Sequence, residues 1–220
     1  MVSRTIGQPM RFLFFYFLLS VLVNNLAIAQ NKVVLPPAFR PQISDGLKKF
    51  FTLSEGQMEE VLKGNVISDG TVDTPGPKQQ QMKLKVAGIH PRNCKRAMRK
   101  LALYENYSDY MSFVKKSSYD ERNQKILFHV DHTLLPFPMV VSFKLARIKE
   151  EGDYPFTFED GFLKDLKGTV IVKEVGKFCL LGLRTDWKGP ESVIPNVIFG
   201  TFVQTVGKMG LEHLIRVSLF

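Results

Sequence analysis

Alternation of apolar and polar residues is the most regular feature of the second half of the chain, and it predicts β-strands. The alternating stretches lie at residues 118–120, 125–134, 138–148, 154–159, 168–174 and 178–187. Two earlier stretches of the same kind occupy residues 65–72 and 83–89, with a turn-forming cluster at residues 73–77 between them. Because short turns join the later stretches and no helical pattern separates them, we expect an antiparallel sheet.

Apolar residues at helical spacing predict a long helix at the end of the chain, from a candidate N-cap at Ser192 to about Val217. One face of this helix carries the apolar side chains Ile198, Phe199, Phe202, Val203, Val206, Met209 and Leu214. Gly200, Gly207 and Gly210 each weaken a helix by about 1 kcal/mol relative to alanine, so close packing must compensate. The broad apolar face requires a sheet to cover it.

Shorter helices are predicted upstream of the later strands. Ser54 and Gln57 have the spacing of a capping box, and the helix that they begin ends at Gly64. A second helix is predicted over residues 91–104, and a short aromatic helix or turn over residues 106–114. Together these elements predict an α+β fold in which a curved antiparallel sheet grips the long C-terminal helix.

The first residues of the chain have the pattern of a secretory signal. Arg4 and Arg11 precede the apolar run at residues 12–23, and small residues at Ala27 and Ala29 form a cleavage site. We therefore expect a signal peptide at residues 1–29 and a bacterial periplasmic or secreted location. A proline-rich leader is expected at residues 30–52, where Pro36, Pro37 and Pro41 block helix and sheet, and one domain at residues 53–220.

Charge narrows the range of partners. The whole chain has a formal charge of +9, and the part after the signal keeps 28 basic and 21 acidic side chains, a charge of +7. A positive surface favours anionic partners such as lipid head groups, so an anionic membrane surface is one expected partner. Export and the lack of basic residues interleaved with aromatics argue against nucleic acid. We expect a monomer.

Cys94 and Cys179 are the two cysteines of the chain. An even pair in an oxidising compartment can close a disulfide. Cys94 lies at the start of a predicted helix and Cys179 lies in a predicted strand, so two buried thiols fit the sequence equally well. Neither cysteine has the neighbouring cysteine of a redox catalyst.

Several short segments, taken with the order of the elements, carry a resemblance to a known superfamily. They lie at residues 86–91, 107–114, 162–169, 186–190 and 194–195. In type and order, residues 65–217 resemble the START-like helix-grip superfamily, which includes polyketide cyclase, lipid-transfer and ubiquinone-binding proteins. The resemblance implies an apolar cavity between the sheet and the final helix, and this superfamily has no universal catalytic signature.

Two predicted strands supply apolar side chains for such a cavity, because alternate residues point to one face. The inward residues are Ile126, Phe128, Val130, His132 and Leu134 in one strand and Phe137, Met139, Val141, Phe143 and Leu145 in the next. The residues that we assign to the ligand cavity are Phe128, Val130, His132, Met139, Val141, Phe143, Phe202, Val206, Met209 and His213. A filled core would have the same pattern.

Histidines provide the candidate polar groups of this face. His132 and His213 fall in phase with apolar residues and could orient a ligand or move a proton, although a histidine in such a position is more often a core residue bonded to the backbone. His129 and His132 point to opposite faces of their strand, so we expect no metal site. No phosphate-binding loop and no nucleophile elbow occurs, and we assign no catalytic residue and no cofactor.

The sequence therefore favours a protein that binds and carries a hydrophobic small molecule, a lipid or isoprenoid, without catalysis. One alternative is an enzyme of the polyketide cyclase or aromatase type, which would use His132, His213, Arg147 or Tyr154 as acid or base. A second alternative is a structural or interaction protein with a filled core.

Overall fold

The fold is described from a computed structural model of the chain. The structure describes residues 35–131, 138–161, 163–192 and 194–219, all within one compact unit, Lys32–Phe220. The predicted signal peptide at residues 1–29 and the first leader residues, 30–34, lie outside the described residues. Within these ranges, no helix has the length and apolar character needed to cross a membrane.

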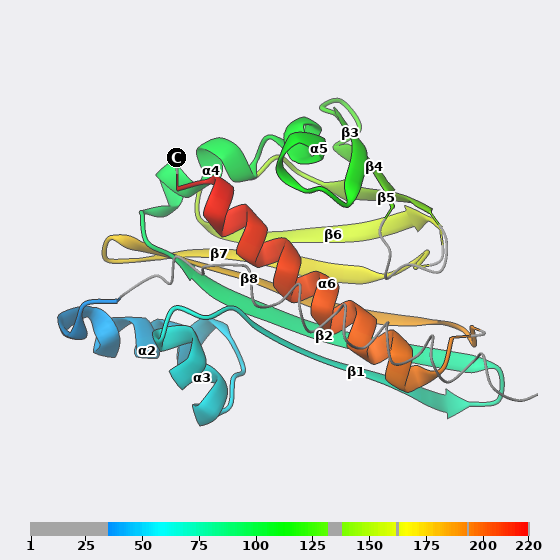
Figure 1. The fold of residues 1–220 in the computed structure, drawn as a ribbon, viewed down its shortest axis with the longest axis horizontal. Helices are drawn as coiled ribbons and strands as arrows, with labels where there is room; N and C mark the ends of the chain where they lie inside the picture. Colours follow the sequence, from blue (N-terminus) through cyan, green and yellow to red (C-terminus); the bar gives the residue numbers. More distant parts are fainter. Residues whose placement is uncertain (1–34, 132–137, 162, 193, 220) are drawn as a thin grey trace, which may run out of the picture. The chain divides into compact units, whose positions relative to one another are not determined.

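The described part of the chain forms an eight-stranded antiparallel sheet (Figure 1). Its strands follow one another across the sheet in the order β1-β2-β8-β7-β6-β5-β4-β3, so the last strand joins the first two to the rest. The strands are β1 Ile67–Gly76, β2 Gln79–His90, β3 Val114–Asp120, β4 Lys125–Val130, β5 Met139–Leu145, β6 Gly152–Asp160, β7 Lys167–Val175 and β8 Phe178–Pro190. This sheet and the long final helix confirm the predicted fold class.

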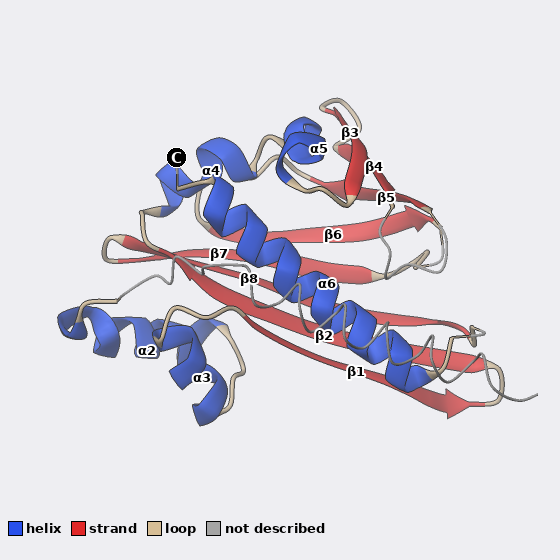
Figure 2. Cartoon of the chain, viewed as in Figure 1, coloured by secondary structure: helices blue, strands red, loops and turns tan. Residues whose placement is uncertain are grey.

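Among the described residues, helices precede β1, follow β8 and occupy the connection between β2 and β3 (Figure 2). They are η1 Pro37–Phe39, α2 Arg40–Phe50, α3 Glu55–Leu62, α4 Cys94–Leu101, η2 Tyr104–Asn106, α5 Tyr107–Tyr110 and α6 Asn196–Val217. The capping box predicted at the start of α3 is confirmed, since the side chains of Ser54 and Gln57 each accept a hydrogen bond from the other's backbone N–H.

The two faces of the sheet belong to two separate hydrophobic clusters. Leu84 and Val86 of β2 point to the inner face, where they join a large cluster with α4, α5 and α6. Ala87 and Ile89 of the same strand point to the outer face, where α2 and α3 cover them. Alternate side chains of one strand therefore pack into the two clusters on opposite faces of the sheet, and the inner face is the one that packs against α6.

The expectation of an irregular proline-rich leader is wrong for residues 37–50, which form η1 and α2. Pro37 and Pro41 lie in the first positions of these two helices, where the missing N–H has no partner to lose. Ile43 and Leu47 of α2 are fully buried on the outer face of the sheet. The segment is thus part of the packed domain.

Several predicted boundaries also change. β1 continues to Gly76 through an irregular register at residues 73–76, where a turn was expected. α4 begins at Cys94, after an Asn93 cap, and ends at Leu101, so it is shorter than predicted. α6 begins at Asn196, because its N-cap is Pro195 and not Ser192.

The apolar face predicted for α6 is only partly the face that packs on the sheet. Phe199 and Val203 are buried as expected, whereas Ile198 is 61% and Val206 37% exposed. Gly207 lies in the contact, and a Cβ there would come within 2.9 Å of Val86 Cγ2. Close approach at this small residue rotates the helix, so the larger side chains do not all face the strands.

Cys94 and Cys179 form a disulfide with a Cα–Cα distance of 4.7 Å, which decides between the two readings of the sequence. Both residues are buried in the inner cluster. The bond joins the start of α4 to β8 and closes a long loop, with 85 positions of sequence separation.

Candidate functional site

A row of aromatic side chains crosses the inner face from α5 to β6. The rings of Tyr107 and Phe128 stack with centroids 5.4 Å apart, and Phe128 meets Phe143 edge-on at 5.6 Å. Phe143 in turn contacts Phe158 at 5.0 Å, and Phe156 lies beside both. We call Tyr107, Phe128, Phe143 and Phe158 the aromatic row. Strand pairing builds it, since β4, β5 and β6 place these residues on adjacent strands.

Much of this face is only half-buried. Phe128, Phe143 and Phe158 pack against the inner cluster but keep part of their surface accessible. The same holds for other apolar residues around them, which are Tyr110, Phe113, Leu163, Val170, Leu183, Ile194, Phe202, Leu211 and Leu214. Large apolar side chains that share a face and stay partly exposed are typical of a ligand-binding surface.

The structure brings together most of the predicted cavity residues of β4 and β5. Register places Phe128 opposite Val141 and Val130 opposite Met139, and all four side chains are half-buried. His132, predicted in the same set, lies outside the described residues, as do Leu134 and Phe137. The inward alternation predicted for these two strands agrees with the described part, because Ile126 and Leu145 are buried in the inner cluster.

The predicted residues of α6 are less uniform. Phe202 packs against the inner cluster, and Met209 and His213 are half-buried. Val206 is 37% exposed, so much of its side chain faces solvent. Burial lowers the pKa of His213, and the nearby positive charge of Arg216 lowers it further. His213 is therefore neutral at pH 7 and cannot act as a permanently charged group.

His90 is a buried polar residue that the sequence did not single out. It is fully buried, and its Nδ1 accepts a hydrogen bond from the backbone N–H of Arg92 at 3.1 Å. Its Nε2 has no hydrogen-bond partner among the described residues. Burial lowers the pKa of His90, so the ring stays neutral at pH 7. The strand register sets His90 opposite Cys179, beside the disulfide.

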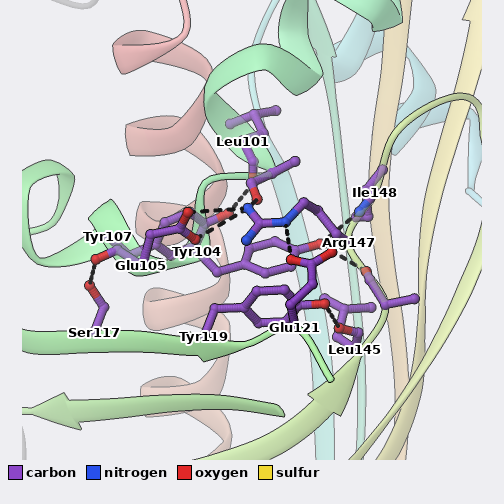
Figure 3. Close-up of polar contacts among 12 residues, drawn as sticks. Leu101, Tyr104, Glu105, Tyr107, Ser117, Tyr119, Glu121, Leu145, Arg147 and Ile148 are labelled. Atoms are coloured by element: carbon purple, nitrogen blue, oxygen red, sulfur yellow. Dashed lines mark hydrogen bonds and ion pairs between the residues drawn. The ribbon is translucent and has the colours of Figure 1, made fainter. Parts of the chain in front are cut away.

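Arg147 is held in a polar network between the segment that follows α4 and the end of β3 (Figure 3). Its Nε donates to Glu121 at 2.9 Å, and its Nη1 donates to the Ala102 carbonyl at 2.6 Å and to Glu105 at 3.2 Å. The guanidinium also lies 4.5 Å from the ring centroid of Tyr119. These contacts occupy the guanidinium of Arg147, which is one of the groups that a cyclase-type enzyme would use as an acid or base.

Hydrogen bonds of this network and beside it fix the segment that carries Tyr107, the first ring of the aromatic row. The hydroxyl of Tyr104 donates to the Ala146 carbonyl at 3.1 Å and accepts from the Ile148 N–H at 3.1 Å. The hydroxyl of Tyr107 donates to the Leu101 carbonyl at 2.6 Å. Burial raises the pKa of both tyrosines, so neither supplies a proton at neutral pH. Their role is positional.

The remaining possible sites in the described residues are a tyrosine, a metal-binding group and a surface pocket. The hydroxyl of Tyr154 donates to the Glu150 carbonyl at 2.9 Å. The described residues contain no group of three His, Cys, Asp or Glu residues that could hold a metal ion. A pocket of about 390 Å³ near the β1–β2 turn is lined by two lysines and two glutamines together with Pro75, Gly189 and Pro190. The charged and amide groups make it a poor fit for a hydrophobic molecule.

No protein-family model and no curated protein matches the sequence. Solved structures do match the fold. A conserved protein from Geobacillus kaustophilus aligns with a TM-score of 0.52 at 10% identity, over 62% of this chain and 95% of that chain. The Zhui aromatase/cyclase from Streptomyces sp. R1128 aligns with a TM-score of 0.51 at 10% identity, over 63% and 93%.

The match to the aromatase/cyclase shows a shared fold. The fold is a START-like helix grip. A START superfamily protein from Mycobacterium smegmatis is also similar, with a TM-score of 0.46 at 13% identity, over 62% of this chain and 93% of that chain. At these identities the likeness describes the helix-grip architecture and not the chemistry.

Proposed function

We propose that this protein is exported and binds a hydrophobic small molecule, a lipid or an isoprenoid, on the inner face of its sheet. It carries this ligand without making or breaking bonds. The observation that carries the proposal is the aromatic row, in which Phe128, Phe143 and Phe158 are half-buried and pack in sequence against the buried ring of Tyr107.

Apolar burial supplies the binding energy in this proposal. Each square ångström of apolar surface removed from water contributes about 25 cal/mol, so a ligand that covers several half-exposed rings is held firmly. Aromatic faces add favourable ring contacts to planar or unsaturated ligands. The polar network at Arg147 fixes the segment that presents Tyr107, so this end of the aromatic row is already ordered.

The cyclase alternative has less support. Among its four candidate groups, Arg147 and Tyr154 are occupied by internal hydrogen bonds, and His132 lies outside the described residues. His213 alone is half-buried on α6, and one neutral imidazole is a sparse set for acid–base catalysis. The carrier is therefore the simpler proposal. A filled core would leave fewer large apolar side chains accessible.

The proposal is tested by mass spectrometry of an organic extract from the protein after expression of the full-length sequence in a bacterium. We expect a stoichiometric hydrophobic molecule from the unmodified protein. Val141 and Val140 offer a matched pair, because they are adjacent on β5 but Val141 is half-buried on the inner face and Val140 is 51% exposed on the other.

Val141→Asp should lose the molecule, whereas Val140→Asp should keep it. Thermal unfolding followed by circular dichroism shows that both variants are folded, and Val141→Ala replaces Val141→Asp if the aspartate prevents folding. An extract with no such molecule from folded protein contradicts the carrier and favours a filled core. If both variants retain the molecule equally, the molecule binds somewhere other than the aromatic row.

Export is tested separately by the mass of the protein recovered from the periplasm or medium. Cleavage after Ala29 predicts a mature chain that begins at Gln30. The buried Cys94–Cys179 disulfide supports this location, because such bonds persist in oxidising compartments. An uncleaved chain that stays in the cytoplasm with reduced cysteines contradicts it.

A further inference from the structure

Helix α4 carries five cationic side chains on and just before it. They are Arg92, Lys95, Arg96, Arg99 and Lys100, of which the first four are exposed and the last is half-buried. The four within the helix span roughly 140° of arc at 100° per residue, and they lie opposite the buried positions Cys94, Ala97, Met98 and Leu101. We call these five residues the basic face of α4.

No acidic residue occurs between positions 91 and 104, so the basic face has no acidic neighbour along its own helix. Among the residues that the structure describes, no side chain forms an ion pair with any of the five. Elsewhere cations are often paired, as Lys125 and Lys144 are with Glu159.

This concentration of charge opposes the stability of the helix. Lys95 and Arg99, and likewise Arg96 and Lys100, are four residues apart, and like charges at that spacing repel. The apolar side of α4 and the disulfide at Cys94 hold it in place regardless. An anionic partner outside the molecule would relieve the repulsion.

The position of α4 connects this face to the ligand surface. α4 contacts both β8 and α6, and α5, which carries Tyr107 of the aromatic row, also contacts α6. Figure 1 shows α4 beside the last turns of α6, at the end of the sheet opposite the β1–β2 turn. A flat anionic surface that met the basic face would therefore lie against the end of the molecule where α4, α5 and α6 meet.

We propose that the basic face of α4 docks this protein onto a bilayer that contains anionic phospholipids. The biological purpose, loading or delivery of the ligand, rests on the function proposed above, whereas the docking itself does not. The helix packs flush on the core and exposes no aromatic side chain for base stacking, which argues against single-stranded nucleic acid.

The test is flotation of the purified protein with vesicles of phosphatidylcholine alone or mixed with phosphatidylglycerol. Binding should require phosphatidylglycerol and should fall steeply when salt is raised to about 0.5 M, because salt screens charge. Each cation near such a surface contributes roughly a five-fold change in affinity. The triple variant Lys95→Gln, Arg96→Gln, Arg99→Gln should therefore bind about 100-fold more weakly.

The chain offers a control with the same charge change at the other end of the sheet. Lys78, Lys83 and Lys188 are exposed near the β1–β2 turn and the end of β8. The triple variant Lys78→Gln, Lys83→Gln, Lys188→Gln should retain most of the binding. If both triple variants lose binding equally, net charge and not the basic face is responsible, and the proposal fails.

Two further outcomes would overturn it. Val197 and Ile198 are 81% and 61% exposed at the start of α6, and loss of binding in Val197→Ser, Ile198→Ser but not in the α4 variant would assign docking to that end. Tighter binding to a random duplex oligonucleotide than to vesicles, abolished by the α4 variant, would assign the face to nucleic acid.

The organic extract of the α4 variant keeps the two proposals apart. A variant that no longer floats but still yields the bound molecule supports docking through α4 and leaves the carrier intact. A protein that floats as expected but yields no molecule in any form supports docking and contradicts the carrier.

Discussion

At the scale of single residues, the glycines of α6 decide how the helix meets the sheet. All three were expected to need close packing, but they differ. A Cβ at Gly207 would lie 2.9 Å from Val86 Cγ2 and 3.2 Å from Ser68 Oγ, whereas a Cβ at Gly210 would meet nothing within 4 Å. Gly200 is intermediate, with Val72 Cγ2 at 3.8 Å. Sequence shows the cost of each glycine, but only the packed structure shows which one is required.

These differences predict opposite effects of one substitution on the same helix. Gly210→Ala should raise the free energy of unfolding by about 1 kcal/mol, because alanine is the better helix former and has room. Gly207→Ala should lower it by about 1 kcal/mol, since the branched side chain of Val86 cannot move aside without strain. Urea denaturation of both variants measures the two values. A stabilised Gly207→Ala would show that α6 does not approach β2 closely.

His90 makes stability depend on pH. Its pKa in the folded protein lies below the ordinary value, so its contribution is complete above the unfolded pKa of about 6.5 and is lost as pH falls below it. The slope from this one group is at most about 1.4 kcal/mol per pH unit. Asparagine at this position keeps an acceptor for the Arg92 N–H and does not titrate.

We therefore expect the urea midpoint of the unmodified protein to fall between pH 7 and pH 5, and that of His90→Asn to fall less. His213→Asn is the control. The pKa of His213 is also lowered, but its side chain is half-exposed, so this substitution should change the pH profile less than His90→Asn does. Equal pH profiles for the unmodified protein and His90→Asn would show that His90 is not the titrating group.

At the scale of elements, most helices and strands could be predicted, because their patterns are local. The capping box at Ser54, the inward alternation of β4 and β5, and the long final helix are encoded within a few residues. α2 was missed because prolines were taken as breakers, although Pro41 lies where a first turn accepts it. Its buried Ile43 and Leu47, four residues apart, were the available signal.

Packing of α2 on the outer face predicts a large effect from a single side chain. Leu47→Ala should lower the free energy of unfolding by about 3 kcal/mol, because Leu47 is fully buried between α2 and the sheet. Lys48→Ala, on the exposed side of the same helix, should change it by less than about 0.5 kcal/mol. If denaturant unfolding shows equally small effects for both variants, residues 37–50 do not pack on the domain and form a loose leader, as the sequence predicted.

The disulfide is the strongest single link between elements. A loop of this length, with a separation of 85 residues, is worth about 4.6 kcal/mol in the chain-entropy model. The double variant Cys94→Ala, Cys179→Ala should lose a comparable amount, and the difference should vanish when both proteins are unfolded under reducing conditions. A loss below about 1 kcal/mol would show that the two cysteines are not bonded in the purified protein.

At the scale of the whole molecule, the sequence predicted the layers but not how the sheet is joined. The pairing of β2 with β8, from Gln79–Pro190 to His90–Cys179, links segments far apart in the chain. No local pattern specifies such a register. The aromatic row could be anticipated only strand by strand, because its rings meet through the pairing of β4, β5 and β6 and the placement of Tyr107 by the Arg147 network.

The same arrangement separates the two proposed interactions. The proposed ligand surface is on the inner face of the sheet, whereas the basic face of α4 is exposed to solvent, and both lie near the end of α6. Removal of the charges on α4 should therefore leave ligand affinity unchanged. Changes to the aromatic row should leave vesicle binding unchanged.

The central claim is that an apolar molecule binds on the aromatic row. The most direct measurement is the set of intermolecular nuclear Overhauser effects between the protein's side chains and the isoprenoid alcohol farnesol, used as a probe. The account predicts effects to the rings of Phe128, Phe143 and Phe158 and to Phe202 on α6. Effects confined to the exposed Val140, Val197 or Ile198, or none at saturating probe, would contradict it.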